Sequence, residues 1–190
     1  MAPIDHYLEL KLLPDPEFPA PQLMNALFAK LHRGLHDLRR NDVGVSFPDV
    51  EQARHGLGAR LRLHGSAEAL ARLMALNWLT GMRDHLDIGE VAPVPPQAKH
   101  RCVSRVQVDS NPERLRRRLM KRHGLDAEAA QARIPDNAAQ RCALPFVSLR
   151  SNGSGEHFRL FIRHGPLLDT AQPGPFGAYG LSTTTTVRWF

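Results

Sequence analysis

The chain has 190 residues, of which 42% are hydrophobic; this size and composition support an ordinary core and exclude a disordered basic tail. No apolar run reaches transmembrane length and the first residues lack a signal-like pattern, so we expect a soluble cytoplasmic protein without a membrane partner. The formal net charge of +6 and the isoelectric point of about 10.0 favour a polyanionic partner. The two cysteines lack CxxC spacing, which argues against a disulfide framework or a zinc site.

The first half of the chain alternates between strand and helix patterns. Residues His6–Leu13 alternate as a strand does, and Gln22–Leu38 carries leucines at helical spacing. In Ala59–Gly65 two leucines share one face of a strand and three basic residues share the other. The predicted elements are strands over residues 6–13, 43–47, 59–65 and 85–91, a helix over 22–38, and a second helix capped by Ser66.

The order strand–helix–strand–strand–helix–strand predicts the α+β fold class. It is the order of a ferredoxin-like sandwich, here residues 1–94, in which two helices cover a four-stranded antiparallel sheet. Residues 92–100 are proline-rich and lack periodicity, as an inter-domain linker does. Residues 95–190 then form a smaller α/β domain, with a strand over 103–109, helices over 111–123 and 126–134, strands over 144–151 and 157–165 joined by a turn at 152–155, and a β-rich ending over 177–190.

The segment SNPERLRRRLMKRHGL, Ser110–Leu125, predicts a strongly basic helix. Ser110 and Glu113 have the spacing of a capping box, and Gly124 suits the helix C-terminus. Residues 101–122 contain eight arginines and lysines and two acids, a net charge of +6 that equals the charge of the whole chain. At 100° per residue, five cations fall within about 140° of the helix surface, namely Arg114, Arg117, Arg118, Lys121 and Arg122.

This helix is either a solvated face or a contact with a polyanion. A solvated helix normally mixes charges of both signs at i,i+4, whereas this stripe has no acid, so we favour the polyanion. A membrane surface is disfavoured because the opposite face has few bulky aromatic residues. Arginine suits phosphates and guanine edges in both DNA and RNA, so the helix alone does not decide between them. A DNA-binding regulator is disfavoured because no helix-turn-helix pair is evident.

Six segments together resemble the type I-F CRISPR repeat-processing endoribonucleases, the Csy-type CRISPR-associated RNA endonucleases. They are DHYLELKLLPDPEFP, LFAKLH, GVSFPD, SRVQVDSNPERLRRRLMKRH, LPFVSLRS and HFRLFIRHGPL, and they follow the family's order from end to end. The resemblance implies an enzyme that binds the hairpin of CRISPR repeat RNA and cuts at the base of its stem without metal or cofactor. Such an enzyme leaves a 2′,3′-cyclic phosphate and a 5′-hydroxyl, stays on the product, and joins the subunits of a type I-F effector complex.

The resemblance also implies which residues form the site. The motif LFxKLH carries the family's catalytic histidine, FVxLR precedes its serine, and its tyrosine precedes GLS. The motif SRVQ carries the base-contacting arginine and glutamine, and an aromatic residue stacks at the base of the stem. In this sequence these positions are His32, Ser151 and Tyr179 for catalysis, Arg105 and Gln107 for base contacts, Phe158 for stacking, and Arg114 to Arg122 for the groove-binding helix.

These residue types agree with the implied chemistry. The 2′-hydroxyl of a nucleotide must lose a proton before it attacks the neighbouring phosphorus, and a neutral imidazole at His32 can accept that proton. Taken alone, His32 would more often be a packing or surface residue, or half of an i,i+4 metal pair with His36 that lacks a third ligand. Ser151 and Tyr179 alone are a turn residue and a strand aromatic. Lys121 stands where the family favours arginine, which weakens any two-pronged contact there. The alternative function is an RNA-binding subunit with the same hairpin grip and no catalysis.

Overall fold

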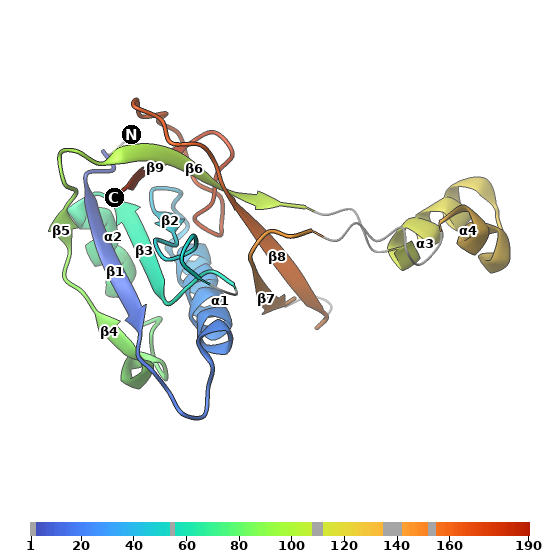
Figure 1. The fold of residues 1–190 in the computed structure, drawn as a ribbon, viewed down its shortest axis with the longest axis horizontal. Coiled ribbons are helices and arrows are strands. Elements are labelled where there is room, and N and C mark those ends of the chain that lie inside the picture. The colour runs from blue at the N-terminus through green and yellow to red at the C-terminus, as the bar shows by residue number, and fades with distance from the viewer. Residues whose placement is uncertain (1–2, 54–55, 108–111, 135–141, 152–154) are drawn as a thin grey trace. The chain divides into compact units, whose positions relative to one another are not determined.

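The structure is a computed structural model and describes residues 3–53, 56–107, 112–134, 142–151 and 155–190, with the backbone alone for residues 112–115 (Figure 1). It confirms the predicted mixture of helices and antiparallel sheets. No helix in these ranges is long and apolar enough to cross a membrane. In chain order the elements are β1 (His6–Leu12), α1 (Ala20–Leu38), β2 (Gly44–Ser46), β3 (Arg60–Gly65), α2 (Ala67–Met74), the 3₁₀ helix η1 (Arg83–His85), β4 (Leu86–Ile88), β5 (Ala92–Pro93), β6 (Lys99–Val106), α3 (Pro112–His123), α4 (Ala127–Arg133), β7 (Phe146–Arg150), β8 (His157–His164) and β9 (Thr186–Trp189).

The first sheet is built around β1 and β3. Its strand order is β2-β3-β1-β4, β5 also pairs with β1, and all of these pairs are antiparallel. Leu8, Leu10 and Leu12 are buried on one face of β1, because alternate side chains of a strand share a face and this one meets α1 and α2. These pairings and the order of the elements agree with the ferredoxin-like arrangement expected for this part of the chain.

Helix α1 buries the predicted stripe of leucines against the sheet. It begins two residues before the predicted start, because Pro21 is tolerated in a first turn that needs no N–H partner. Helix α2 has the predicted cap, in which the Ser66 hydroxyl accepts from the Ala69 N–H at 3.2 Å. The buried leucines of α1 are Leu23, Leu27, Leu31 and Leu35.

The basic face of β3 is buried rather than open to solvent. Arg62 is 3% exposed and His64 is fully buried. Arg62 donates from Nε and Nη2 to Glu9 at 2.8 and 2.6 Å and from Nη1 to the backbone oxygen of Phe190 at 2.9 Å. Its guanidinium carbon also lies 3.7 Å from the centre of the Phe190 ring. The final residues of the sequence therefore cover this face, and a buried cation is held there by a carboxylate, a carbonyl and an aromatic ring.

The second sheet has the strand order β7-β8-β6-β9. The two sheets together correct two predictions. The segment 92–100 is not an unpaired linker, since β5 pairs with β1 and β6 already begins at Lys99. Among the described residues β5 pairs only with β1, and Pro93 is accepted in this short edge strand because proline lacks the N–H that a central strand would need. Over residues 177–190 only β9 is a strand, and the residues before it form turns and loops.

Packing groups the chain into two compact units. One unit contains residues 1–105 and 145–190, and therefore both sheets with α1 and α2. The other contains residues 106–144, with α3 and α4. The predicted domain boundary at residue 94 concerns which segment folds on its own, and it stays a prediction.

In the second unit, α3 packs against α4. Arg116 donates from Nε to the carbonyl of Ile134 at 2.7 Å, which links α3 to the end of α4. Gly124 has a φ of 63° and donates to the Met120 carbonyl at 2.8 Å, which confirms the predicted end of α3. The predicted N-cap Ser110 lies outside the described residues.

Candidate active site

Helix α1 places His32 at the border between core and solvent. Leu31 beside it is fully buried, as is Phe28 one turn earlier, whereas His32 is half-buried. His36, one turn later, is exposed and lies with its Nδ1 3.5 Å from the Asp37 carboxylate. The same helix therefore offers one histidine that is held by the fold and one that is not.

A tight turn over residues 177–180 lies against this part of α1. The Gly180 N–H donates to the Gly177 carbonyl, and the Gly177 N–H donates to the Leu181 carbonyl, both at 2.9 Å. Gly180 has a φ of 68°, and a Cβ atom there would come within 2.7 Å of a Val45 methyl group. Only glycine meets both demands, so Gly180 fixes the path of the turn.

The turn directs a backbone carbonyl at His32. Nδ1 of His32 lies 2.9 Å from the carbonyl oxygen of Ala178. Because a carbonyl can only accept, Nδ1 carries the hydrogen in the neutral ring, and Nε2 is left with its lone pair. His32 is thereby held in the tautomer that a general base needs.

The ring of Tyr179 stacks on His32. The two ring centres are 4.0 Å apart and the planes differ by 17°. Phe28 lies parallel to Tyr179 at 6.3 Å between centres. The imidazole therefore cannot rotate freely, because the Ala178 carbonyl holds its edge and Tyr179 covers one face.

Arg105 and an open pocket lie on the Tyr179 side of this cluster. The guanidinium carbon of Arg105 is 5.9 Å from the centre of the Tyr179 ring. The pocket has a volume of about 330 Å³. It adjoins the ring that holds His32, so a ligand in it would lie close to the candidate base. Its lining residues are Arg105, Gly177, Tyr179, Leu181, Ser182 and Thr183.

Ser151 and Phe158 lie on the hairpin of β7 and β8, which is anchored to α1. The Asn25 side chain on α1 accepts from the Ser148 N–H at 2.9 Å, so β7 runs beside that helix. Ser151 follows β7 directly, where its N–H donates to Glu156 and its carbonyl accepts from Gly155, both at 2.9 Å. The contacts thus gather His32, Tyr179 and Arg105 into one cluster, while Ser151 and Phe158 are placed on the neighbouring hairpin.

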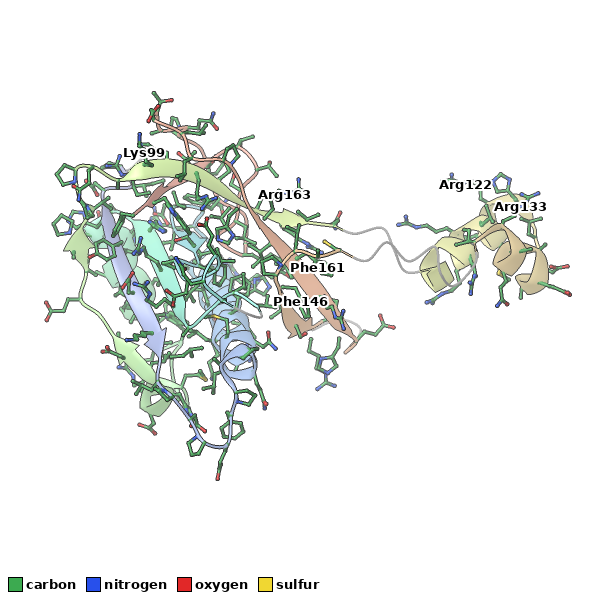
Figure 2. All side chains as sticks on the ribbon, in the orientation of Figure 1. Lys99, Arg122, Arg133, Phe146, Phe161 and Arg163 are labelled. Carbon is green, nitrogen blue, oxygen red and sulfur yellow. The ribbon has the colours of Figure 1, made fainter. Side chains whose placement is uncertain are left out.

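The remaining predicted RNA-binding residues belong to the second unit. Arg117, Arg118, Lys121 and Arg122 are exposed on α3, with Leu119 and Met120 half-buried, as the predicted stripe requires. Figure 2 shows Arg122 on α3 and Arg133 on α4. Gln107 is exposed. The side chain of Arg114 lies outside the described residues.

Comparison with known proteins decides the family. A family model described as CRISPR-associated protein (Cas_Csy4) matches residues 7–190. The chain belongs to this family. The CRISPR-associated endonuclease Cas6/Csy4 of Pseudomonas aeruginosa (strain UCBPP-PA14) is 57% identical over 187 residues, which cover 98% of this chain and 100% of that protein. A protein of the same name from Escherichia coli (strain UTI89 / UPEC) is 52% identical over 187 residues, with the same coverage. The resemblance recognised in the sequence is confirmed.

In this Csy4-family chain, sequence reasoning missed the groups that hold the histidine. Ala178 acts through its backbone carbonyl, which no side-chain motif reveals. Ser182 and Thr183 of the pocket follow Tyr179 closely, but no sequence motif marks them. The available signal was the spacing of Gly177 and Gly180, which is typical of a tight turn.

Proposed function

We propose that the chain is a metal-independent endoribonuclease that binds the hairpin of CRISPR repeat RNA and cuts at the base of its stem. The products are a 2′,3′-cyclic phosphate and a 5′-hydroxyl, and the protein stays on the hairpin product in the cytoplasm as part of a type I-F effector complex. Membership of the Cas_Csy4 family and relatives named CRISPR-associated endonuclease support this function. The geometry of His32 supports the mechanism.

The hydrogen bond between His32 and the Ala178 carbonyl carries the proposal. It leaves Nε2 as a proton acceptor at a half-buried position that substrate can reach. Nε2 takes the proton of the 2′-hydroxyl, and the 2′-oxygen forms a bond to the neighbouring phosphorus. The bond from phosphorus to the 5′-oxygen breaks, and that oxygen takes up a proton to become the 5′-hydroxyl. The nucleophile belongs to the substrate, so no metal hydroxide is needed for the attack.

The other predicted residues orient the reacting groups. Tyr179 keeps the imidazole fixed and its ring face favours the positive charge that develops on His32. Ser151 holds the 2′-oxygen or its ribose in the reactive geometry. Phe158 stacks under the terminal base pair of the stem, and Arg105 and Gln107 contact base edges above it.

A hairpin with one 2′-deoxy nucleotide just before the cut tests the chemistry. We expect it to bind as the all-RNA hairpin does and to remain uncut, because the attacking oxygen is missing. The all-RNA hairpin should be cut in EDTA, with a cyclic phosphate detected by mass spectrometry. Cleavage of the deoxy hairpin, or a need for Mg²⁺, would contradict the mechanism. Binding without cleavage of either RNA would indicate the non-catalytic subunit instead.

Binding should depend on the basic stripe of α3. Replacing Arg117 and Arg118 by alanine should flatten the plot of log K against log salt by roughly 0.7 to 0.9 for each RNA phosphate that the variant no longer neutralises. Both residues are exposed, and no carboxylate pairs with them in the described part of the chain. Exposed Lys11 and Arg83, replaced together by alanine, provide the control with the same change in charge. An equal slope for both double variants would indicate that the basic stripe of α3 is a solvated face that does not contact RNA.

A further inference from the structure

The face of the β7–β8 hairpin that points away from its buried residues has the composition of a nucleic-acid contact. Val147, Leu149, Leu160 and Ile162 are buried on one face of these two strands. Alternate side chains point the other way, and the antiparallel register pairs Phe146 with Phe161, Ser148 with Arg159 and Arg150 with His157. We call this surface the outer hairpin face; its residues are Phe146, Ser148, Arg150, His157, Arg159, Phe161 and Arg163.

The outer hairpin face combines exposed cations with aromatic rings. Arg150, Arg159, Arg163 and His157 are exposed, and the two phenylalanines are half-buried. The face has no acidic residue; the nearest acid in the sequence, Glu156, precedes β8. No carboxylate in the described part of the chain pairs with these arginines. A solvated strand face would carry both signs of charge, so this face is suited to an anionic partner.

The aromatic residues are ordered by contacts within the face. The rings of Phe146 and Phe161 meet edge to face, with centres 5.5 Å apart. The Arg159 guanidinium carbon lies 4.7 Å from the centre of the Phe146 ring. Figure 2 shows Phe146, Phe161 and Arg163 on these two strands. Flat rings beside arginines are the groups on which unpaired bases stack while phosphates are neutralised, without preference for a base sequence.

We propose that the outer hairpin face binds the single-stranded RNA that lies upstream of the repeat hairpin. The inference rests on the proposed function, in which Phe158 lies under the terminal base pair. His157 and Arg159 flank Phe158 in the chain, so their Cα atoms are about 3.8 Å from its own, while their side chains point to the opposite face of β8. A strand that leaves the stem base therefore reaches the outer hairpin face within a few nucleotides.

The position of β8 distinguishes the upstream strand from the strand that is cut. Strand β7 lies next to α1 through the Ser148–Asn25 hydrogen bond, and β8 lies on the other side of β7. Three of the four basic residues of the face are on β8, away from the helix that carries His32. The cut strand must reach His32, and its partner leaves the base pair on the opposite side. The upstream strand also remains after cleavage, so its contacts help the protein to stay on its product.

Three RNAs test the proposal: the bare hairpin, the hairpin with about ten unpaired upstream nucleotides, and the hairpin with about ten unpaired downstream nucleotides. A 2′-deoxy nucleotide at the cut keeps all of them intact. By fluorescence anisotropy, the parent should bind the upstream-extended RNA roughly tenfold more tightly than the bare hairpin, since one stacked base and a few phosphate contacts suffice for such a change.

The double variant Arg159→Gln/Arg163→Gln should lose this advantage and bind the bare hairpin as the parent does. Phe161→Leu, which keeps an apolar side chain but removes the ring, should lose part of it. Lys11→Gln/Arg83→Gln, which removes two exposed charges elsewhere, should retain it. Equal parental affinity for the bare and upstream-extended RNAs would overturn the proposal, and so would an advantage for the downstream-extended RNA alone. Failure of the parent to bind the bare hairpin would instead count against the proposed function.

Discussion

His32→Ala should bind the repeat hairpin nearly as tightly as the parent and cleave it about 10²- to 10⁴-fold more slowly, which is the usual contribution of one positioned acid–base group. The hydrogen bond to Ala178 and the stack on Tyr179 hold the imidazole in place, and neither contact is made by a residue predicted to bind the stem. Single-turnover cleavage at saturating protein measures the chemical step, and anisotropy with the 2′-deoxy hairpin measures binding.

His36→Ala is the matched control for this experiment. His36 lies one turn further along α1, is exposed, and contacts neighbouring Asp37 rather than the turn at residues 177–180. Its removal should leave cleavage at the parental rate. If His32→Ala also cut at that rate, His32 would be a packing residue of α1. If it lost binding and cleavage in equal proportion, His32 would hold RNA rather than move a proton.

The sequence predicted helix α1 but not the contacts of Ala178 and Tyr179 that hold His32 in place. Leucine spacing fixes which face of α1 is buried, because that pattern is local. The contact between His32 and Tyr179 joins residues that are far apart in the chain, and its geometry depends on a turn whose key atom is a backbone oxygen. The role of Tyr179 could therefore be inferred only from the family resemblance, while the tautomer of His32 required the structure.

The alternating pattern of β3 likewise predicted which side chains share a face but not what covers that face. It grouped Arg62 with His64 correctly, but it could not show that Phe190 covers that face. The prediction of an unpaired linker over residues 92–100 was wrong. Proline content indicates local stiffness, but it does not show whether the edge of β1 is available for pairing. The basic stripe of α3 was predictable because helical geometry and charge are sufficient to define it.

One buried and one half-buried histidine, His64 and His164, should make the free protein sensitive to acid. Burial, with the charge of Arg101 as the second cause and partly opposed by Glu51, lowers the pKa of His164 from 6.5 to about 4. Burial, followed by the charge of Arg62, also lowers the pKa of His64 well below 6.5. Both rings are therefore neutral in the folded state at a pH where the unfolded chain binds protons. Their contribution to stability is complete above pH 6.5 and is lost as the pH falls from 6.5 towards the folded-state values.

His164 alone should account for a loss on the order of 2–3 kcal/mol of unfolding free energy between about pH 8 and pH 4.5, given its pKa of about 4. Urea unfolding followed by tryptophan fluorescence at both pH values measures the total loss, to which carboxylates and His64 also contribute.

The variant His164→Phe isolates the share of His164. A ring remains beside Phe47 and Trp189, whose centres lie 6.1 and 5.6 Å from that of His164, while the ionisable group is removed. His164 Nε2 is buried without a hydrogen-bond partner among the described residues, so the phenyl ring removes no bond from that atom. The variant should lose less stability on acidification than the parent, and exposed His36→Gln should lose as much as the parent. Equal losses in the parent and His164→Phe would mean that His164 binds its proton as readily in the folded protein as in the unfolded chain, and that the acid sensitivity has another source.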